Sequence, residues 1–122
     1  MSRPVHFEIP AKNPEKTAEF YTKAFGWRIK KWEGPIEYWL ITTGEDSEPG
    51  INGGLLRRTD PQQQCVNTVG VADVDKAVET IVKLGGTIMV PKMPIPGMGW
   101  LAYCNDPEGN AFGVMQPDET AK

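Results

Sequence analysis

The same order of strand-like and helix-like patterns occurs twice along the chain. Apolar and polar residues alternate at positions 5–9 and 65–71, which is the period of a strand with one buried face. A stretch with helical period follows each run and predicts helices over 13–25 and 74–84. Three strand-like runs then follow each helix, at 27–32, 37–42 and 51–56 in the first half and at 87–90, 100–104 and 111–116 in the second. Each half is therefore predicted to fold as strand, helix and three strands.

The ends of the two predicted helices carry matching signals. Asn13 and Asp73 are suited to be N-caps, and Pro14 takes the first-turn position that proline favours. Glycines at 26 and at 85–86 follow the helices and are typical of helix ends. At an offset of 60 residues the identical pairs are Lys16/Lys76, Glu19/Glu79, Lys23/Lys83 and Gly26/Gly86. This repetition indicates that the two halves are copies of one unit.

One face of each predicted helix is apolar. The first helix is expected to bury Ala18, Tyr21 and Phe25, with Phe20 and Ala24 widening the stripe; the second is expected to bury Val74, Ala77, Val78, Ile81 and Val82. Each helix should cover the outer face of its own four-stranded mixed sheet and leave the opposite face as a concave cup. The fold class is therefore α+β, with a single domain over 1–122 made of βαβββ modules at 1–57 and 65–122 and a polar connector at 58–64.

Composition narrows the classes of function. The 122 residues carry a net charge of −3, and 39% are hydrophobic, which fits a folded globular protein. We expect no membrane span, because no apolar run is long enough, and no nucleic-acid partner, because the basic pairs at 30–31 and 57–58 form no stripe. The start lacks the apolar stretch of a secretory signal, so we expect a cytoplasmic protein in which Cys65 and Cys104 stay reduced.

Two sequence motifs resemble a known family. The run VHF followed by NPEKTAEFYTKAFGW, and the closing DPEGNAFGVMQ, are similar to the vicinal oxygen chelate superfamily, which includes glyoxalase I, bleomycin and fosfomycin resistance proteins and extradiol dioxygenases. The resemblance spans nearly the whole chain. It implies the glyoxalase/bleomycin resistance/dihydroxybiphenyl dioxygenase fold, a homodimer, and one divalent metal ion per cup.

The metal positions implied by this resemblance are mostly without ligands. Superfamily enzymes commonly draw ligands from the first and last strands of each module, and these positions fall here on His6, Gly54, Val66 and Gly113. A catalytic zinc site usually has three protein ligands, and only His6 can supply one. We therefore predict no cofactor and no metal ion. The alternative is a ligand set from elsewhere, such as Glu8 beside His6.

The cup is expected to bind a small organic molecule. Alternation in the first strand places His6 and Glu8 on the cup face if the superfamily geometry holds. The other lining residues predicted from the strands and the loop before the seventh strand are Asn52, Gly54, Leu56, Val66, Thr68, Trp100, Ala111, Gly113 and Met115. His6 is either a general base oriented by Glu8 or a lining histidine held by a carbonyl or water. Glycines at 54 and 113 are expected to widen the space.

The proline-rich segment 91–100 is predicted to be a semi-rigid loop, because it holds three prolines and two glycines. It either closes over a hydrophobic ligand or packs on a sheet edge or dimer interface. Tyr38 and Tyr103 are interpreted as structural hydrogen-bond donors.

Three functions remain open at this point. The leading hypothesis is a glyoxalase-like protein that binds a small organic molecule without a metal ion. The second is an enzyme: a glyoxalase-like lyase or isomerase using His6 and Glu8, or a metal-dependent enzyme of dioxygenase type with another ligand set. The third is a protein-interaction module.

Overall fold

The computed structural model describes residues 2–122, which divide into two compact units. His6–Cys65 form the N-terminal unit, and residues 2–5 together with 66–122 form the C-terminal unit. Strand β1 (Arg3–Ala11) begins in the second of these units and continues into the first.

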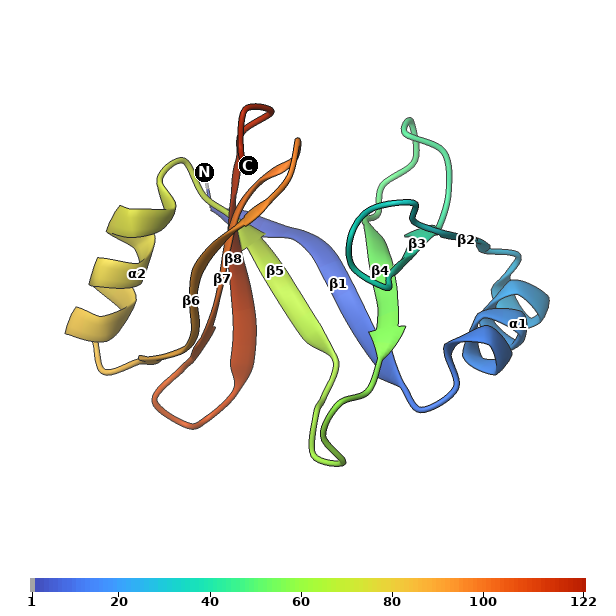
Figure 1. Cartoon of the computed structure of the whole chain (residues 1–122), viewed down its shortest axis with the longest axis horizontal. Coiled ribbons are helices and arrows are strands. Elements are labelled where there is room, and N and C mark those ends of the chain that lie inside the picture. The colour runs from blue at the N-terminus through green and yellow to red at the C-terminus, as the bar shows by residue number, and fades with distance from the viewer. Residues whose placement is uncertain (1) are drawn as a thin grey trace. The chain divides into compact units, whose positions relative to one another are not determined.

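The N-terminal unit contains four strands and one helix (Figure 1). After β1 come α1 (Pro14–Phe25), β2 (Arg28–Lys31), β3 (Trp39–Thr42) and β4 (Asn52–Arg57). The strands lie in the order β2-β3-β4-β1, with antiparallel pairs β2/β3 and β3/β4 and a parallel pair β4/β1. The predicted strand, helix and three strands are thereby confirmed for this half.

The C-terminal unit repeats this arrangement. Its elements are β5 (Val66–Gly70), α2 (Val74–Lys83), β6 (Thr87–Ile95), β7 (Gly99–Asn105) and β8 (Ala111–Pro117). The strands lie in the order β6-β7-β8-β5, again with two antiparallel pairs and one parallel pair, β8/β5. The α+β class and the repeated βαβββ order are therefore as predicted.

The helices begin and end where the sequence indicates. The Asn13 side chain accepts a hydrogen bond from the backbone N–H of Lys16 at 3.2 Å, and Asp73 does the same for Lys76 at 3.1 Å. These bonds satisfy backbone donors that the first turn of a helix leaves without partners. Gly26 ends α1 with a φ of +74°, a left-handed conformation that glycine adopts at little cost.

Each helix covers one face of its own sheet. In the N-terminal unit α1 contacts β2 and β4, and the buried cluster consists of Ala11, Trp39, Ile41 and Leu55 with Phe7, Ile9, Ala18, Trp27 and Ile29 packed against it. In the C-terminal unit α2 lies along β6 and also contacts β7 and β8 (Figure 1). Its cluster consists of Val74, Ala102 and Val114 with Val69, Val71, Val78, Ile81, Trp100 and Phe112.

Part of the predicted helix burial is wrong. Phe20 is 61% exposed and Phe25 is 64% exposed. Phe20 follows Ala18 by two residues, which places it about 200° around the helix from the buried face. Phe25 is the last residue of α1 and rests on the ring of Trp27, with the ring centroids 5.3 Å apart. In α2, Val82 is likewise exposed.

The proline-rich segment is a strand over most of its length, and the loop prediction for 91–100 was wrong. Strand β6 continues to Ile95 with two register shifts, and Pro94 pairs with Trp100 of β7. Because β6 is the last strand of its sheet, its prolines do not interrupt a ladder on both sides, and edge strands tolerate the missing N–H. Only the turn around Gly97 separates β6 from β7.

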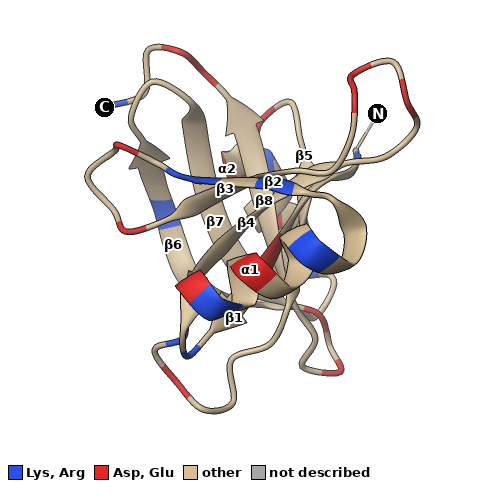
Figure 2. Ribbon diagram, turned by 90° about the vertical axis from the view of Figure 1, so that its right-hand side faces the viewer, with Lys and Arg blue, Asp and Glu red and all other residues tan. Residues whose placement is uncertain are grey.

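Other sequence expectations can be checked directly. The turn before β8 forms as predicted, with the Gly109 N–H donating to the Asp106 carbonyl at 3.0 Å. Cys65 is exposed and Cys104 is buried, and both are free thiols. Acidic and basic residues both occur along α1 (Figure 2). Lys23 and Glu19 of this helix form an ion pair. None of the helices within residues 2–122 has the length and apolar character needed to cross a membrane.

Candidate ligand-binding site

The side chains of β1 alternate between two environments. Phe7 and Ile9 pack with Ala18 of α1 in the buried cluster. His6 and Glu8 therefore leave the sheet on the face that α1 does not cover, because neighbouring residues of a strand point to opposite faces. This is the orientation that the sequence predicts for both residues.

The pairing of the strands shows which residues of β3 and β4 share the face of His6 and Glu8. His6 pairs with Asn52 and Glu8 with Gly54, while Leu40 of β3 also pairs with Gly54. Laterally paired residues share a face of the sheet. We call the surface formed by His6, Glu8, Leu40, Asn52, Gly54 and Leu56 the helix-free face of the N-terminal sheet.

Two consecutive glycines of β4 make room for aromatic side chains on opposite faces. A Cβ at Gly53 would lie 2.6 Å from the ring of Phe7, on the side covered by α1. A Cβ at Gly54 would overlap the hydroxyl end of Tyr38, on the helix-free face. The space over Gly54, expected to be open to a ligand, is therefore taken by a side chain of the protein itself.

The Tyr38 hydroxyl joins the two polar side chains of β1. It donates a hydrogen bond to Oε2 of Glu8 at 2.9 Å and lies 2.8 Å from Nε2 of His6. The rings of His6 and Tyr38 are nearly parallel, with an interplanar angle of 16°. We call His6, Glu8 and Tyr38 the Tyr38 cluster.

Burial affects both polar side chains of β1. Glu8 is only 8% exposed, so its carboxylate depends on hydrogen bonds from the protein in place of water. Burial also lowers the pKa of His6 from its ordinary value of 6.5, and the nearby charge of Glu8 opposes this effect. The imidazole of His6 is therefore neutral at pH 7.

Trp32 supports the Tyr38 side chain. The backbone N–H of Trp32 donates to the Tyr38 carbonyl at 2.8 Å, and the two rings meet edge to face with centroids 6.5 Å apart. The Trp32 ring lies over Gly34, where a Cβ would overlap it. The segment before β3 is thereby folded so that the Tyr38 hydroxyl reaches β1.

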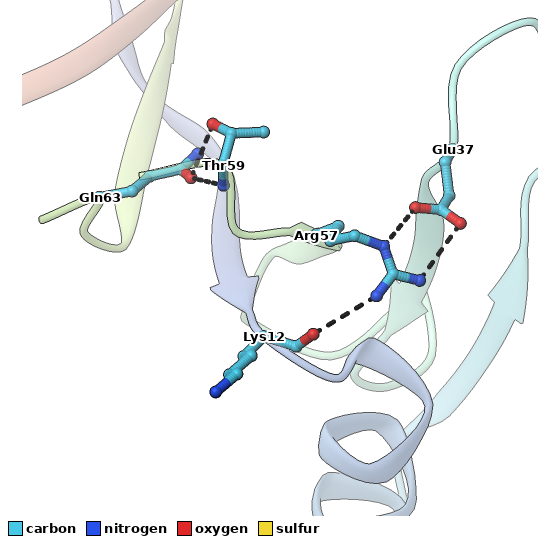
Figure 3. A network of polar contacts seen from close by, with 5 residues as sticks. All are labelled: Lys12, Glu37, Arg57, Thr59 and Gln63. Atoms are coloured by element: carbon cyan, nitrogen blue, oxygen red, sulfur yellow. Dashed lines mark hydrogen bonds and ion pairs between the residues drawn. The ribbon is translucent and has the colours of Figure 1, made fainter. Parts of the chain in front are cut away.

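An ion pair holds the residue next to Tyr38 (Figure 3). Nε of Arg57 donates to Oε1 of Glu37 at 2.9 Å, and Nη2 lies 3.4 Å from Oε2. Nη1 of Arg57 also donates to the carbonyl of Lys12 at 3.3 Å. Arg57 thus ties the start of β3 to the ends of β1 and β4, and Thr59 and Gln63 bond to each other nearby.

The other predicted lining residues are placed in different ways. Asn52 shares the helix-free face, but its Oδ1 accepts hydrogen bonds from Thr43.

In the C-terminal unit, Thr68 is 4% exposed and pairs with Gly113, and a Cβ added at Gly113 would lie 3.0 Å from Thr68 Oγ1. By strand alternation, Val66, Ala111 and Met115 share that face, which α2 does not cover.

Trp100 does not share a face with these residues. It packs against the buried cluster on the α2 side, and its Nε1–H donates to Asp118 Oδ2 at 3.0 Å. Lys92 lies over its ring, with Nζ 5.0 Å from the centroid. The structure therefore gives Trp100 a packing position on the opposite side of the sheet.

A separate hollow of about 480 Å³ lies between α2 and strands β5 and β8. Its apolar lining includes Val69, Val71, Ala77, Ile81, Phe112 and Val114. The charged residues at this hollow are Asp73, which caps α2, and Lys76. It lacks the convergent polar groups that mark a binding site, so the Tyr38 cluster remains the stronger candidate.

The metal-ligand positions of the resemblance do not form a metal site in this structure. Within residues 2–122 there is no group of three or more His, Cys, Asp or Glu side chains placed to hold an ion. Nε2 of His6 is engaged by Tyr38, and the side-chain space over Gly54 is filled. These residues do not supply the three protein ligands of a typical catalytic zinc site.

Sequence reasoning missed the role of Tyr38. It lies 30 residues from Glu8 and 32 from His6 in the chain, and no spacing motif links it to β1. The one usable signal was the Gly53–Gly54 pair in a strand, because an interior glycine often marks the close approach of another group.

Comparisons with known proteins agree with this fold. The model of the Glyoxalase/Bleomycin resistance protein/Dioxygenase superfamily matches residues 3–114. CFP32 of Mycobacterium tuberculosis and of Mycobacterium bovis, named as a candidate glyoxylase, is 26% identical over 115 residues. These residues cover 89% of this chain but 43% of the relative, so the chain spans less than half the length of the curated relatives it matches.

Solved structures share the fold at low sequence identity. A methylmalonyl-CoA epimerase in complex with methylmalonyl-CoA superposes with a TM-score of 0.72 at 17% identity, over 100% of this chain and 99% of that chain. The Streptomyces coelicolor methylmalonyl-CoA epimerase gives 0.70 at 17% identity, covering 98% and 97%. A protein from Bacillus halodurans gives 0.71 at 13% identity, covering 99% and 98%.

Proposed function

Because the chain belongs to the Glyoxalase/Bleomycin resistance protein/Dioxygenase superfamily, we propose that it binds a small organic molecule on the helix-free face of the N-terminal sheet without a metal ion. The observation that carries this proposal is the Tyr38 hydroxyl, which stands over Gly54 and contacts both His6 and Glu8. A metal ligand at Gly54 would need the space that Tyr38 occupies.

The surroundings of the Tyr38 cluster suit an organic ligand. Leu40 is 38% exposed and lies beside Gly54 on the same face, and Leu56 is half-buried there. Apolar surface next to a few fixed polar groups is the usual composition of a small-molecule site. The polar groups orient the ligand, and the apolar area supplies most of the favourable free energy.

A thermal-shift experiment tests metal independence. Zn²⁺, Ni²⁺, Mn²⁺ and Fe²⁺ are each added to the purified protein, together with a separate panel of aromatic and aliphatic small molecules. We expect no metal ion to raise the melting temperature and at least one organic compound to raise it, because a ligand stabilises the state that it binds. A rise with one metal ion that disappears in His6→Gln contradicts the proposal.

Paired substitutions locate the binding surface. Leu40→Glu changes the helix-free face, and Thr80→Glu changes the hollow beside α2; both residues are exposed, so the fold should persist. We expect Leu40→Glu to abolish the stabilisation by an organic ligand and Thr80→Glu to leave it unchanged. The reverse result would place the ligand in the hollow beside α2.

A second candidate is a metal-independent lyase or isomerase that uses the Tyr38 cluster for proton transfer. The hydrogen-bonded histidine and buried carboxylate favour it, since acid–base catalysis needs such groups in contact. The names of the relatives, a candidate glyoxylase and epimerases, also favour an enzyme. Turnover of a carbonyl compound that His6→Gln abolishes would establish this candidate.

We also propose a homodimer in the cytoplasm. Large apolar side chains remain exposed on both helices and at the end of α2, among them Phe20, Phe25, Val82 and Leu84, and apolar patches of this kind occur at protein interfaces. The same exposure supports the third alternative, a protein-interaction module. Light scattering of the purified chain distinguishes a dimer from a monomer.

A further inference from the structure

The hydrogen bonds of the Tyr38 cluster have a defined direction. The Tyr38 hydroxyl has a single proton and donates it to Oε2 of Glu8. Its oxygen is then an acceptor for His6, and Nε2 of His6 carries the proton that points at it over 2.8 Å. A neutral imidazole with a proton on Nε2 has a free electron pair on Nδ1.

Nδ1 of His6 is open to a ligand. The side chains and backbone of residues 2–122 form no hydrogen bond to this atom, while every buried polar side-chain atom of that range has a partner. Nδ1 therefore reaches solvent. With its proton on Nε2, directed at the Tyr38 oxygen, the neutral imidazole keeps Nδ1 as an acceptor.

The nearby surface restricts what can donate to this atom. Leu40 and Leu56 are the apolar members of the face that carries His6, and an apolar ligand body gains by covering them. A donor with a full positive charge would lose hydration against this surface. A weakly acidic O–H on an apolar body satisfies both conditions.

Given the proposed binding function, we propose that Nδ1 of His6 accepts a hydrogen bond from a weakly acidic hydroxyl, phenolic or enolic, of an otherwise apolar ligand. Tyr38 and Glu8 are positioning residues that fix the proton of His6 on Nε2. No covalent bond forms or breaks in this recognition, so the claim concerns binding alone.

The test compares two probes that differ in whether they can donate a hydrogen bond. 4-Chlorophenol has a weakly acidic hydroxyl, and 4-chloroanisole carries a methoxy group in its place. We expect the wild-type protein to bind 4-chlorophenol about tenfold more tightly, as one hydrogen bond is worth about 1.4 kcal/mol. The nitrogen-15 resonance of Nδ1, unambiguous because His6 is the single histidine, should shift only with the phenol.

Variants separate the hydrogen bond from a structural effect. His6→Phe keeps an aromatic ring without an acceptor and should bring the ratio of the two affinities to about one. Tyr38→Phe and Glu8→Gln should lower the ratio and reduce the Nδ1 shift, while Tyr21→Phe on α1 leaves both unchanged. Circular dichroism and the melting temperature verify that each variant is folded.

Three outcomes overturn this inference. Equal affinity for the two probes shows that the hydroxyl is not recognised, and a ratio that survives in His6→Phe shows that another group accepts it. Failure of both probes to bind at millimolar concentration excludes this ligand class. The proposed binding function is decided separately by the panel of small molecules and the Leu40→Glu variant.

Discussion

The two halves of the chain share one strand order but differ in what surrounds the same glycine position. In the N-terminal unit Gly54 pairs with Glu8, and the Tyr38 hydroxyl fills the space above it. In the C-terminal unit Gly113 pairs with Thr68, and a Cβ added at Gly113 would lie 3.0 Å from the Thr68 hydroxyl oxygen. The backbone geometry is repeated, whereas the pair of a histidine and a carboxylate on the first strand occurs in the N-terminal half.

This difference shows how a duplicated fold can keep chemistry in one copy. The residue 60 positions after His6 is Val66, and the residue 60 positions after Glu8 is Thr68. Neither can titrate in the physiological range. The first strand of the N-terminal unit therefore carries an imidazole and a carboxylate, while the corresponding positions of the C-terminal unit carry an apolar side chain and a hydroxyl.

The largest contrast is expected from adding a methyl group at each glycine. Gly54→Ala should displace Tyr38 and break its bonds to His6 and Glu8, at a cost of about 2–3 kcal/mol in the free energy of unfolding. Gly113→Ala needs a shift of only a few tenths of an ångström at Thr68 and should cost about 1 kcal/mol. Urea unfolding measures both values, and equal losses would contradict the assigned role of Gly54.

Removing one hydroxyl tests the Tyr38 cluster with a smaller change. Tyr38→Phe removes the hydrogen bond from the Tyr38 hydroxyl to the buried Glu8 carboxylate and should lower the free energy of unfolding by about 1–2 kcal/mol. Tyr21, which stacks on Trp27 on the other side of the sheet, is the matched control. Tyr21→Phe should change stability by less than about 0.5 kcal/mol, and an equal effect of the two variants would remove the case for a special role of Tyr38.

The pH dependence of stability should differ between wild type and His6→Gln. The unfolded histidine has its ordinary pKa of 6.5, and the folded pKa is lower because the ring is buried. As the pH falls below 6.5, the unfolded chain takes up a proton first, so the wild type loses stability until the folded pKa is reached. Asp106 does not interfere with this measurement. Its pKa is lowered mainly by the hydrogen bond from the Asn110 side chain, so its contribution to stability is lost only as the pH falls below its ordinary pKa of 3.8.

Urea unfolding of both proteins between pH 7.5 and pH 5 measures this contribution. His6→Gln should lack the loss of stability that begins near pH 6.5. Parallel curves for the two proteins would show that His6 titrates as it does in water.

The smallest effect is expected from the exposed ion pair. Arg57→Ala removes the guanidinium that holds Glu37 beside Tyr38, but half-exposed ion pairs contribute little to stability. The melting temperature should change less than in Tyr38→Phe. A larger loss than in Tyr38→Phe would mean that the hydrogen bond from Arg57 to the Lys12 carbonyl contributes more to the stability of the fold than the ion pair with Glu37 does.

Local signals made most of the fold predictable. Asn13, Asp73 and Gly26 mark helix ends by chemistry that acts within a few residues, and strand alternation placed His6 and Glu8 on the correct face. Segment 91–95 could not be read this way, because prolines are compatible with a strand only at a sheet edge. Whether a strand lies at an edge is decided by the assembled sheet, and the local sequence around the strand carries no signal for it.

The site was predictable only in part. His6 and Glu8 follow from the alternation in β1, but Tyr38 reaches them through a fold of the segment before β3. That fold depends on Gly34, which admits the Trp32 ring, and on Gly54, which admits the hydroxyl. Such tertiary contacts decide whether a tyrosine supports packing or joins a polar cluster.

The central claim is that Tyr38 and Glu8 hold the single histidine with its proton on Nε2. A long-range proton–nitrogen-15 spectrum of His6 at pH 7.5 measures this directly. We expect the Nε2–H form in the wild type and a mixture of both forms in Tyr38→Phe. A wild-type spectrum dominated by the Nδ1–H form, or one that Tyr38→Phe leaves unchanged, would contradict the account.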